Sequence, residues 1–130
     1  MVLKSFQIDP NRPISEQVVA ECMRLIVTGV WEPGEKIPSV RVLAVQFGVN
    51  PNTVQKSLSV LDERGLLVSP STAGRFVTEN VELVTQSLEG IARMYVEEFA
   101  ERMQSLGVTS KQAREYLSDF WDAGAVENAN

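Results

Sequence analysis

Residues 34–54 decide the fold, and they read GEKIPSVRVLAVQFGVNPNTV. Two short helical segments are joined there by a tight turn. Ser39 is a favoured N-cap for the first segment, and Asn50 followed by Pro51 is a strong start for the second. Gly48 can end the first segment because glycine readily adopts the left-handed backbone conformation that such a turn requires. The sequence therefore predicts a helix-turn-helix, with helices over residues 40–47 and 51–64.

The charges around this turn distinguish it from the rest of the chain. Every charged side chain of residues 36–61 is basic, namely Lys36, Arg41 and Lys56. The whole chain has a net charge of -5, but residues 1–79 hold eight basic and eight acidic residues, so the excess negative charge lies in residues 80–130. Since physiological salt screens charges beyond about 8 Å, DNA binding depends on the field at the contact face. A basic, capped helix-turn-helix in an acidic chain indicates an element that reads DNA.

Apolar spacing and turn residues predict the remaining elements. An amphipathic helix begins near Pro13 and ends at Thr28, and a strand–tip–strand pattern over residues 66–78 is typical of the wing of a winged helix. Two further helices follow over residues 82–106 and 110–123. The predicted fold class is mainly α with a small β wing, divided into a winged helix-turn-helix domain over residues 1–79 and a two-helix segment over residues 80–130. The first helix of the helix-turn-helix is expected to bury Val40, Leu43, Ala44 and Phe47.

Composition argues against catalysis. The chain has no histidine and one cysteine, and we find neither a phosphate-binding loop nor a metal-ligand cluster in its sequence. We therefore expect no enzyme activity, no cofactor and no metal. Cys22 lies on an apolar helical face and is expected in the core rather than as a nucleophile. No run approaches the roughly 18 apolar residues of a membrane span, and the N-terminus lacks the apolar region of a signal peptide, so a cytoplasmic location is expected.

The first part of the chain, residues 1–79, resembles the N-terminal domain of the GntR family of bacterial transcription regulators. The matching positions occur in order and at the family's spacing over more than half of the chain. They are Pro13-Ile14-Ser15-Glu16-Gln17-Val18, Gly29, Gly34-Glu35-Lys36-Ile37-Pro38-Ser39, Arg41, Leu43-Ala44, Phe47-Gly48-Val49-Asn50, Thr53-Val54, Leu58, Leu61, Gly65 and Gly74-Arg75-Phe76-Val77.

The short C-terminal part narrows the resemblance. It is similar to the small YtrA-type subfamily, whose two C-terminal helices serve dimerisation. The resemblance implies a sequence-specific transcription regulator that binds an inverted-repeat operator as a dimer, with repression the expected sign. Many relatives carry an arginine early in the recognition helix, whereas this chain has Pro51 and Asn52 there.

A recognition helix presents its first turn to the base edges of the major groove. Because Asn and Gln can pair bidentately with adenine, we expect Asn52 and Gln55 to contact bases, while capping occupies Asn50. Thr53 is expected to bond a phosphate. The full set of expected DNA-binding residues is Lys36, Ser39, Arg41, Asn50, Asn52, Thr53, Gln55, Lys56 and Arg75. Three alternatives stay open: Ser39 as a simple cap, Lys36 as a solvated loop residue, and Arg75 packed over Phe76.

An apolar stripe runs along the predicted helix over residues 82–106, and its residues are Val84, Leu88, Ile91, Tyr95 and Phe99. This is more apolar surface than a wing and one short helix could cover, so we expect a homodimer interface. The alternative is that the helix folds onto its own domain together with the helix over residues 110–123. The aromatic residues there could also enclose a small pocket for an effector, although aromatics at helical spacing are more often core. The residues of that pocket would be Tyr95, Phe99, Phe120 and Trp121.

One other function is compatible with the same fold. A winged helix can serve protein–protein interaction, with the acidic C-terminal helices as its binding surface. Such a module would need no acid-free basic stretch around its turn, which is why DNA binding is the preferred interpretation. Fusion to a catalytic domain, as in some relatives, is a further alternative, and the capped helices over residues 82–124 argue against it.

Overall fold

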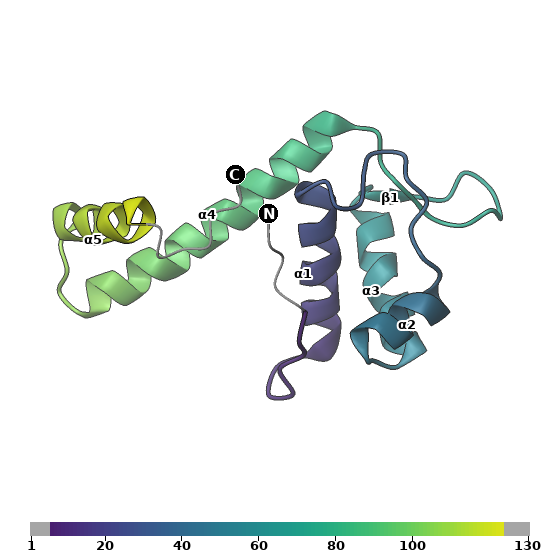
Figure 1. Cartoon of the computed structure of the whole chain (residues 1–130), viewed down its shortest axis with the longest axis horizontal. Coiled ribbons are helices and arrows are strands. Elements are labelled where there is room, and N and C mark those ends of the chain that lie inside the picture. Colours follow the sequence, from purple (N-terminus) through teal and green to yellow (C-terminus); the bar gives the residue numbers. More distant parts are fainter. Residues whose placement is uncertain (1–5, 124–130) are drawn as a thin grey trace. The chain divides into compact units, whose positions relative to one another are not determined.

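The computed structural model describes residues 6–123, and the described residues form five helices and a two-stranded sheet (Figure 1). In chain order the elements are α1 (Ile14–Val27), α2 (Val40–Phe47), α3 (Pro51–Glu63), β1 (Leu67–Val68), β2 (Phe76–Val77), α4 (Val81–Ser105) and α5 (Ser110–Asp122). Within the described range they divide into an N-terminal unit, residues 6–88, and a C-terminal unit, residues 89–123. The boundary therefore falls inside α4 and not at the element change near residue 80.

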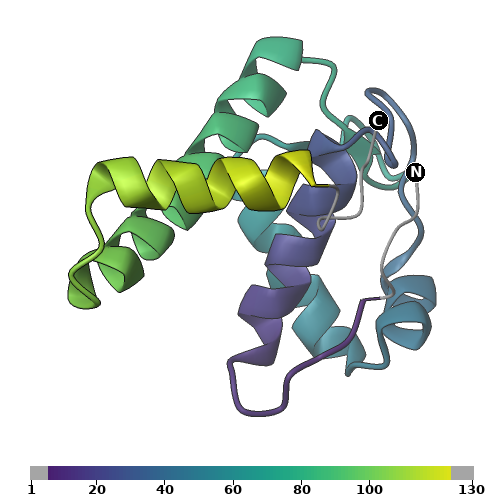
Figure 2. The same cartoon turned by 60° about the vertical axis from the view of Figure 1, so that its left-hand side comes forward.

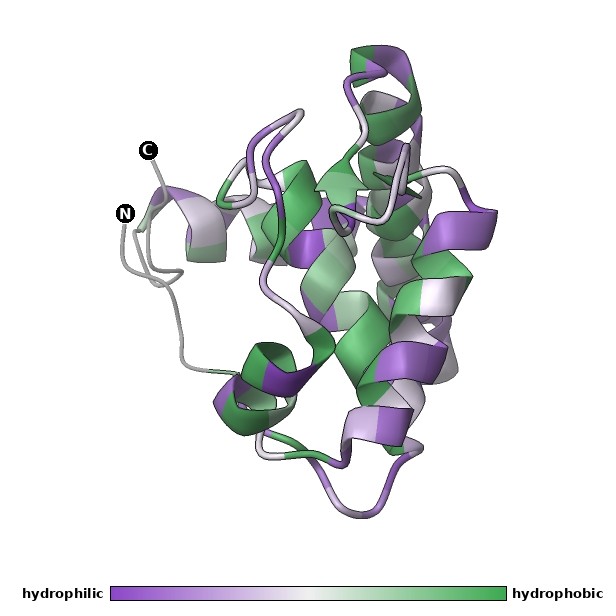
Figure 3. Ribbon diagram, turned by 90° about the vertical axis from the view of Figure 1, so that its right-hand side faces the viewer, coloured by the Kyte–Doolittle hydropathy of each residue, from purple (hydrophilic) through white to green (hydrophobic). Residues whose placement is uncertain are grey.

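The core of the N-terminal unit lies between α1 and α3, which run side by side in both cartoon views (Figures 1 and 2). Figure 3 shows apolar and polar residues alternating along these ribbons, as the helical spacing of apolar residues requires. Val40 and Phe47, which were expected to be buried, are only half-buried. The buried residues of the three helices include Val18, Cys22, Ile26, Leu43, Ala44, Val54, Leu58 and Leu61.

Side-chain caps at the starts of α2 and α3 confirm the predicted helix-turn-helix. The Ser39 hydroxyl accepts a hydrogen bond from the Val42 N–H at 3.3 Å, and the Asn50 side chain accepts from the Asn52 N–H at 2.8 Å. Gly48 has φ +67°, a left-handed conformation that costs glycine little. The turn is therefore fixed by local hydrogen bonds, so that α3 begins at Pro51 as predicted.

The wing is a two-stranded sheet, and a short segment before α2 pairs with its second strand. β1 and β2 pair antiparallel through Leu67↔Val77 and Val68↔Phe76. On its other side β2 hydrogen-bonds the segment before α2, where the Ile37 N–H donates to the Arg75 carbonyl at 3.0 Å and the Val77 N–H donates to the Glu35 carbonyl at 2.9 Å. The sequence predicts the two strands but not this bridge, because so short a segment has no alternating pattern.

The segment preceding α1 is fastened to the N-terminal unit by Gln17, which is only 7% exposed. The Gln17 side chain accepts from the Asp9 N–H at 2.7 Å and donates to the Asp9 carbonyl at 2.8 Å. Phe6 packs edge-on against Phe47 of α2, with ring centroids 5.2 Å apart. Phe6 therefore covers the end of α2, while residues 10–13 of the same segment are exposed to solvent.

The C-terminal unit contains most of α4 and all of α5. A capping box opens α5, in which Thr109 accepts from the Gln112 N–H at 3.2 Å and its own N–H donates to the Gln112 side chain at 3.0 Å. Neither helix buries a residue below the surface, although both carry large apolar side chains. Among the described helices, none has the length and hydrophobicity needed to cross a bilayer.

Candidate nucleic-acid interface

α3 is anchored by one face and open on the other. Val54, Leu58 and Leu61 are at most 1% exposed, and the buried Ser57 hydroxyl lies 3.1 Å from the Ser15 carbonyl of α1. The opposite face points to solvent over the first two turns of the helix. Its exposed residues are Pro51, Asn52, Gln55 and Lys56. A rigidly held helix with a polar, solvent-facing start has the layout required for a recognition helix.

The polar residues at the start of α3 divide into capping and free groups. The Asn50 side chain caps the helix, which confirms its expected structural role. Asn52 is exposed, and no hydrogen bond engages its side-chain amide within residues 6–123. The Gln55 amide lies 3.5 Å from the Ser59 hydroxyl, a long contact that a better partner can replace. Thr53 is half-buried and lies in the first turn of the helix.

Two of the expected backbone-contacting residues flank the start of α2. Ser39 caps the helix with its oxygen as acceptor, which leaves its O–H free to donate to a phosphate. Arg41 is exposed, and its guanidinium makes no ion pair in the described part of the chain. No acidic residue occupies the first turn of either α2 or α3. Both helix starts therefore offer positive potential to an anion.

A hollow of about 430 Å³ lies between the wing tip and the start of α2. Lys36 lies along its wall, with its Cε 2.9 Å from where a Cβ on Gly74 would stand. Hydroxyl groups and basic side chains supply the polar part of the lining, and no carboxylate contributes to it, which suits the hollow to a phosphate oxygen. The lining residues are Lys36, Ile37, Pro38, Ser39, Val40, Leu58, Ser69, Ser71, Thr72, Ala73, Gly74 and Arg75.

Arg75 is engaged within the protein. Its Nε lies 3.1 Å from both carboxylate oxygens of Asp62, and its Nη2 lies 3.1 Å from Oδ2. Sequence reasoning missed this partner because Asp62 stands in the last turn of α3, thirteen residues before Arg75. Asp62 and Arg75 meet only because the wing folds back toward α3, and the spacing of residues in the sequence does not predict this contact.

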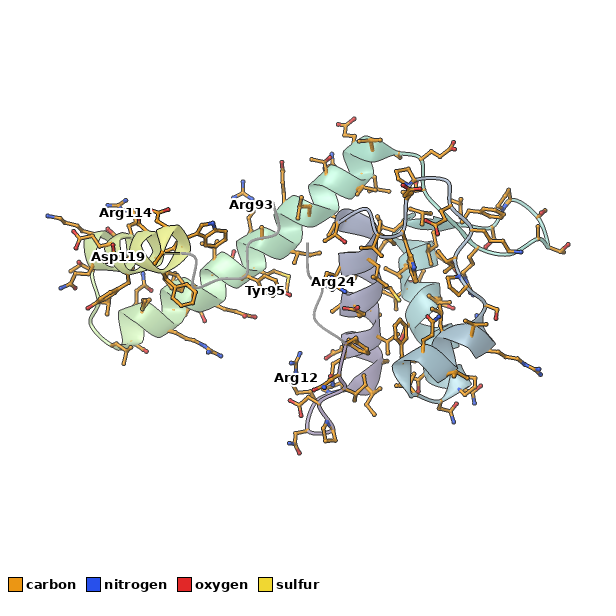
Figure 4. The ribbon with its side chains drawn as sticks, viewed as in Figure 1. Arg12, Arg24, Arg93, Tyr95, Arg114 and Asp119 are labelled. Atoms are coloured by element: carbon orange, nitrogen blue, oxygen red, sulfur yellow. The ribbon has the colours of Figure 1, made fainter. Side chains whose placement is uncertain are left out.

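The expected dimerisation residues lie along α4, and their exposure varies. Leu88 is 46% and Tyr95 is 62% exposed, while Val84, Ile91 and Phe99 are half-buried. Figure 4 shows Arg93 and Tyr95 projecting from α4, and Arg114 and Asp119 from α5. A hollow of about 310 Å³ on α4 is lined by Ala92, Arg93, Val96 and Glu97 and not by the four aromatic residues expected to form an effector pocket.

Comparison with known proteins assigns this arrangement to a family. The family model described as "Bacterial regulatory proteins, gntR family" matches residues 14–77. The HTH-type transcriptional regulator YhcF of Bacillus subtilis, described as uncharacterized, is 31% identical over 118 residues, which cover 91% of this chain and 98% of that protein. The HTH-type transcriptional repressor YtrA of the same organism is 32% identical over 119 residues, 88% of this chain and 90% of that protein.

A solved structure extends the similarity to the backbone. The GntR family transcriptional regulator from Listeria monocytogenes superposes with a TM-score of 0.82 at 31% identity, over 86% of this chain and 98% of that chain. The two curated relatives and this structure are described as transcriptional regulators and not as enzymes. The matches to YhcF and YtrA span at least 90% of each protein, and we conclude that the chain belongs to the gntR family of bacterial regulatory proteins.

Proposed function

We propose that this regulator binds an inverted-repeat operator as a homodimer and represses transcription from it. The observation that carries the proposal is the start of α3, where polar side chains face solvent on a helix whose other face is locked in the core. A helix that was only a structural support would have no need of free amides and an acid-free first turn at its exposed end.

In the proposed complex α3 enters the major groove by its N-terminal turn. Asn52 and Gln55 read adenine through their side-chain amides, each good bidentate pair being worth about 1–3 kcal/mol of discrimination. Lys56 and Thr53 bond phosphates on either side of the groove. Lys36, Ser39 and Arg41 hold the DNA backbone along the hollow beside the wing. Asn50 contributes by fixing the helix start, since its side chain is the cap.

Dimerisation follows from the energetics of operator recognition and from the exposed C-terminal helices. Specific sites need about 4–10 kcal/mol over non-specific DNA, and two half-sites about one helical turn apart supply this where one module cannot. Large apolar side chains on α4 and α5 support a second copy as the cover for this surface. They include Leu88, Tyr95, Tyr116, Leu117, Phe120 and Trp121, each at least 43% exposed.

The proposal also includes repression as the effect on transcription, the cytoplasm as the cellular location, and control by a small-molecule effector. Repression is supported by the relative YtrA, which is named a transcriptional repressor. A protein that acts on bacterial operators works in the cytoplasm. A small apolar effector would bind where Tyr95, Phe99, Phe120 and Trp121 gather in the dimer. If candidate metabolites change neither operator affinity nor melting temperature, the effector pocket is to be abandoned.

Fluorescence-anisotropy titration tests the proposal. The probe is the DNA upstream of the protein's own gene, against a scrambled duplex of equal length, over a salt series. We expect a clear preference for an inverted repeat and an affinity that falls steeply as salt rises. Asn52→Ala and Gln55→Ala should each reduce the preference, whereas Gln86→Ala, an exposed glutamine on α4, should not.

Equal binding to both duplexes would require a second step, the selection of operator fragments from a genomic library. If that selection enriches nothing, sequence-specific DNA binding is refuted, and the protein–protein interaction module takes its place. If it enriches a site that the wild type and the Asn52→Ala and Gln55→Ala variants bind equally, the regulator stands but the assignment of base readout to α3 fails.

A further inference from the structure

The base of the wing is held in the N-terminal unit, where Leu67 and Val77 are at most 2% exposed, whereas residues 69–74 of its tip form no hydrogen bond to the helices. β1 and β2 share two residue pairs, Leu67↔Val77 and Val68↔Phe76, after which the chain leaves the sheet for the tip. Inside the tip the Ala73 N–H donates to the Ser71 hydroxyl at 3.2 Å, a contact that does not reach the helices. A two-residue ladder fixes the direction of a hairpin poorly, so the position of the tip depends on additional ties at its base.

Arg75 supplies two such ties. Its carbonyl accepts the Ile37 N–H at 3.0 Å, which holds it to the segment before α2. Its guanidinium meets the Asp62 carboxylate through three contacts of 3.1 Å, which holds it to the last turn of α3. One residue at the base of the wing is therefore bound at the same time to the segment before α2 and to the last turn of α3.

We infer that the Asp62–Arg75 ion pair is a positioning device that fixes the wing relative to the recognition helix, so that both meet DNA in one register. The inference rests on the proposed function and adds to it a residue, Asp62, with a role in operator binding. In this role Asp62 does not touch DNA, and Arg75 acts by holding the wing in place and not by contacting a phosphate.

The low exposure and the ion pairing of the Arg75 side chain support a positioning role for Arg75. Its side chain is 19% exposed, whereas Arg41 at the start of α2 is solvent-exposed and unpaired within residues 6–123. The pairing consumes the Nε donor and part of Nη2, and it places a carboxylate beside the cation. A phosphate approaching Arg75 would meet that negative charge, while Arg41 offers its full charge.

The sign of the effect of Asp62→Asn separates the two roles. If Arg75 contacts phosphate, removing the neighbouring negative charge strengthens binding to any DNA. If the pair positions the wing, the same substitution weakens operator binding by up to about fivefold relative to non-specific DNA, the equivalent of one exposed ion pair. Glu63→Gln is the matched control, since it removes an equal charge from the neighbouring, exposed position that forms no ion pair in the described structure.

Arg75→Gln provides the second arm. A lost phosphate contact lowers the slope of log affinity against log salt by about 1, whereas a lost positioning contact leaves the slope unchanged. A double variant, Asp62→Asn with Arg75→Gln, should bind the operator no more weakly than either single variant, because both remove the same pair. Amide hydrogen exchange over residues 69–77 of the free protein should accelerate in Asp62→Asn and not in Glu63→Gln.

Three results would overturn the inference. One is an operator preference of Asp62→Asn equal to that of Glu63→Gln. Another is a shallower salt slope in Arg75→Gln. The third is a loss of melting temperature in Asp62→Asn with unchanged wing exchange and operator binding, which would make the pair merely structural. A wild type without any operator preference is a different outcome, because it refutes the proposed function and this inference together.

Discussion

At the scale of single residues, the N-terminal unit is organised by polar groups buried at off-pattern positions. Gln17 is 7% and Ser57 is 0% exposed, yet both lie on helices whose apolar spacing defines the core. Gln17 satisfies its amide on the segment before α1, and Ser57 lies 3.1 Å from the Ser15 carbonyl. The Ser57 hydroxyl also lies 2.8 Å from the Thr53 carbonyl of its own helix. No sequence pattern predicts the contacts to Asp9 and Ser15, because both partners lie outside the helix that carries the buried side chain.

Cys22 gives a prediction at this scale. Desolvation by burial, with a smaller contribution from Glu21, raises the pKa of its thiol from 9.0 to about 12. Above pH 9 the unfolded chain releases this proton and the folded chain keeps it, so the free energy of unfolding falls as the pH rises from 9 toward 12. The decline should be about 1.4 kcal/mol per pH unit. Below pH 9 the group has no effect on stability.

Urea denaturation at pH 8, 9 and 10 measures this decline. Other groups titrate in the same range, so the comparison is with Cys22→Ala, whose stability should fall less steeply by the stated amount. Parallel pH profiles for the two proteins would show that Cys22 titrates alike in the folded and unfolded states, contrary to its burial.

At the scale of elements, boundaries set by caps were predictable and long-range attachments were not. Ser39, Asn50 and Thr109 cap the helices that the sequence predicted at those positions. The sequence also predicted the two strands of the wing. The sequence did not predict the pairing of residues 34–37 with β2 or the Asp62–Arg75 ion pair, because each depends on how the hairpin folds back over α3.

At the start of α3, Asn50 contributes to stability as the helix cap, and Asn52, two residues later, is the proposed base contact. Asn50→Ala removes the cap and should lower the free energy of unfolding by about 1 kcal/mol. Asn52→Ala leaves the cap intact, since Asn52 contributes its backbone N–H, and should leave stability within about 0.5 kcal/mol of the wild type. Its effect should appear in operator preference instead.

Thermal denaturation and anisotropy titration of the two variants test this separation. The assignment of base reading to Asn52 fails if Asn52→Ala is the less stable variant, or if it keeps the wild-type operator preference. Asn50→Ala is the comparison for stability alone, because loss of its cap also loosens the helix start that positions Asn52.

At the scale of the whole molecule, the compact units do not coincide with the change of element at residue 80. Leu83, near the start of α4, packs close to Gly65. A Cβ placed on Gly65 would lie 3.4 Å from the Cδ2 atom of Leu83. The first turns of α4 therefore belong to the N-terminal unit together with the exposed Val81 and Leu88, and the rest of the helix carries the exposed Met94, Tyr95 and Val96. The sequence predicted an apolar stripe along this helix, but a stripe does not reveal where one compact unit ends.

The proposed homodimer gives a prediction at this scale. Tyr95→Arg places a charge in the apolar stripe at a position that is 62% exposed in the single chain, so it should prevent association with little cost to folding. Size-exclusion chromatography with light scattering should report a monomer, and operator affinity should drop to that of a single half-site. Gln104→Arg introduces the same charge on the opposite side of α4 and should remain dimeric. A dimeric Tyr95→Arg protein with wild-type operator affinity would place the interface elsewhere.

The burial of Cys22 also makes the natural chain suitable for site-directed spectroscopy. A buried thiol with a raised pKa offers almost no accessible thiolate near neutral pH, so it reacts with maleimide or methanethiosulfonate reagents far more slowly than an exposed thiol. A cysteine introduced at the exposed Thr72 on the wing tip would then be the single labelled position in each copy. Pulsed electron paramagnetic resonance between two such spin labels would give the separation of the wings with and without DNA, in a protein whose own cysteine need not be replaced.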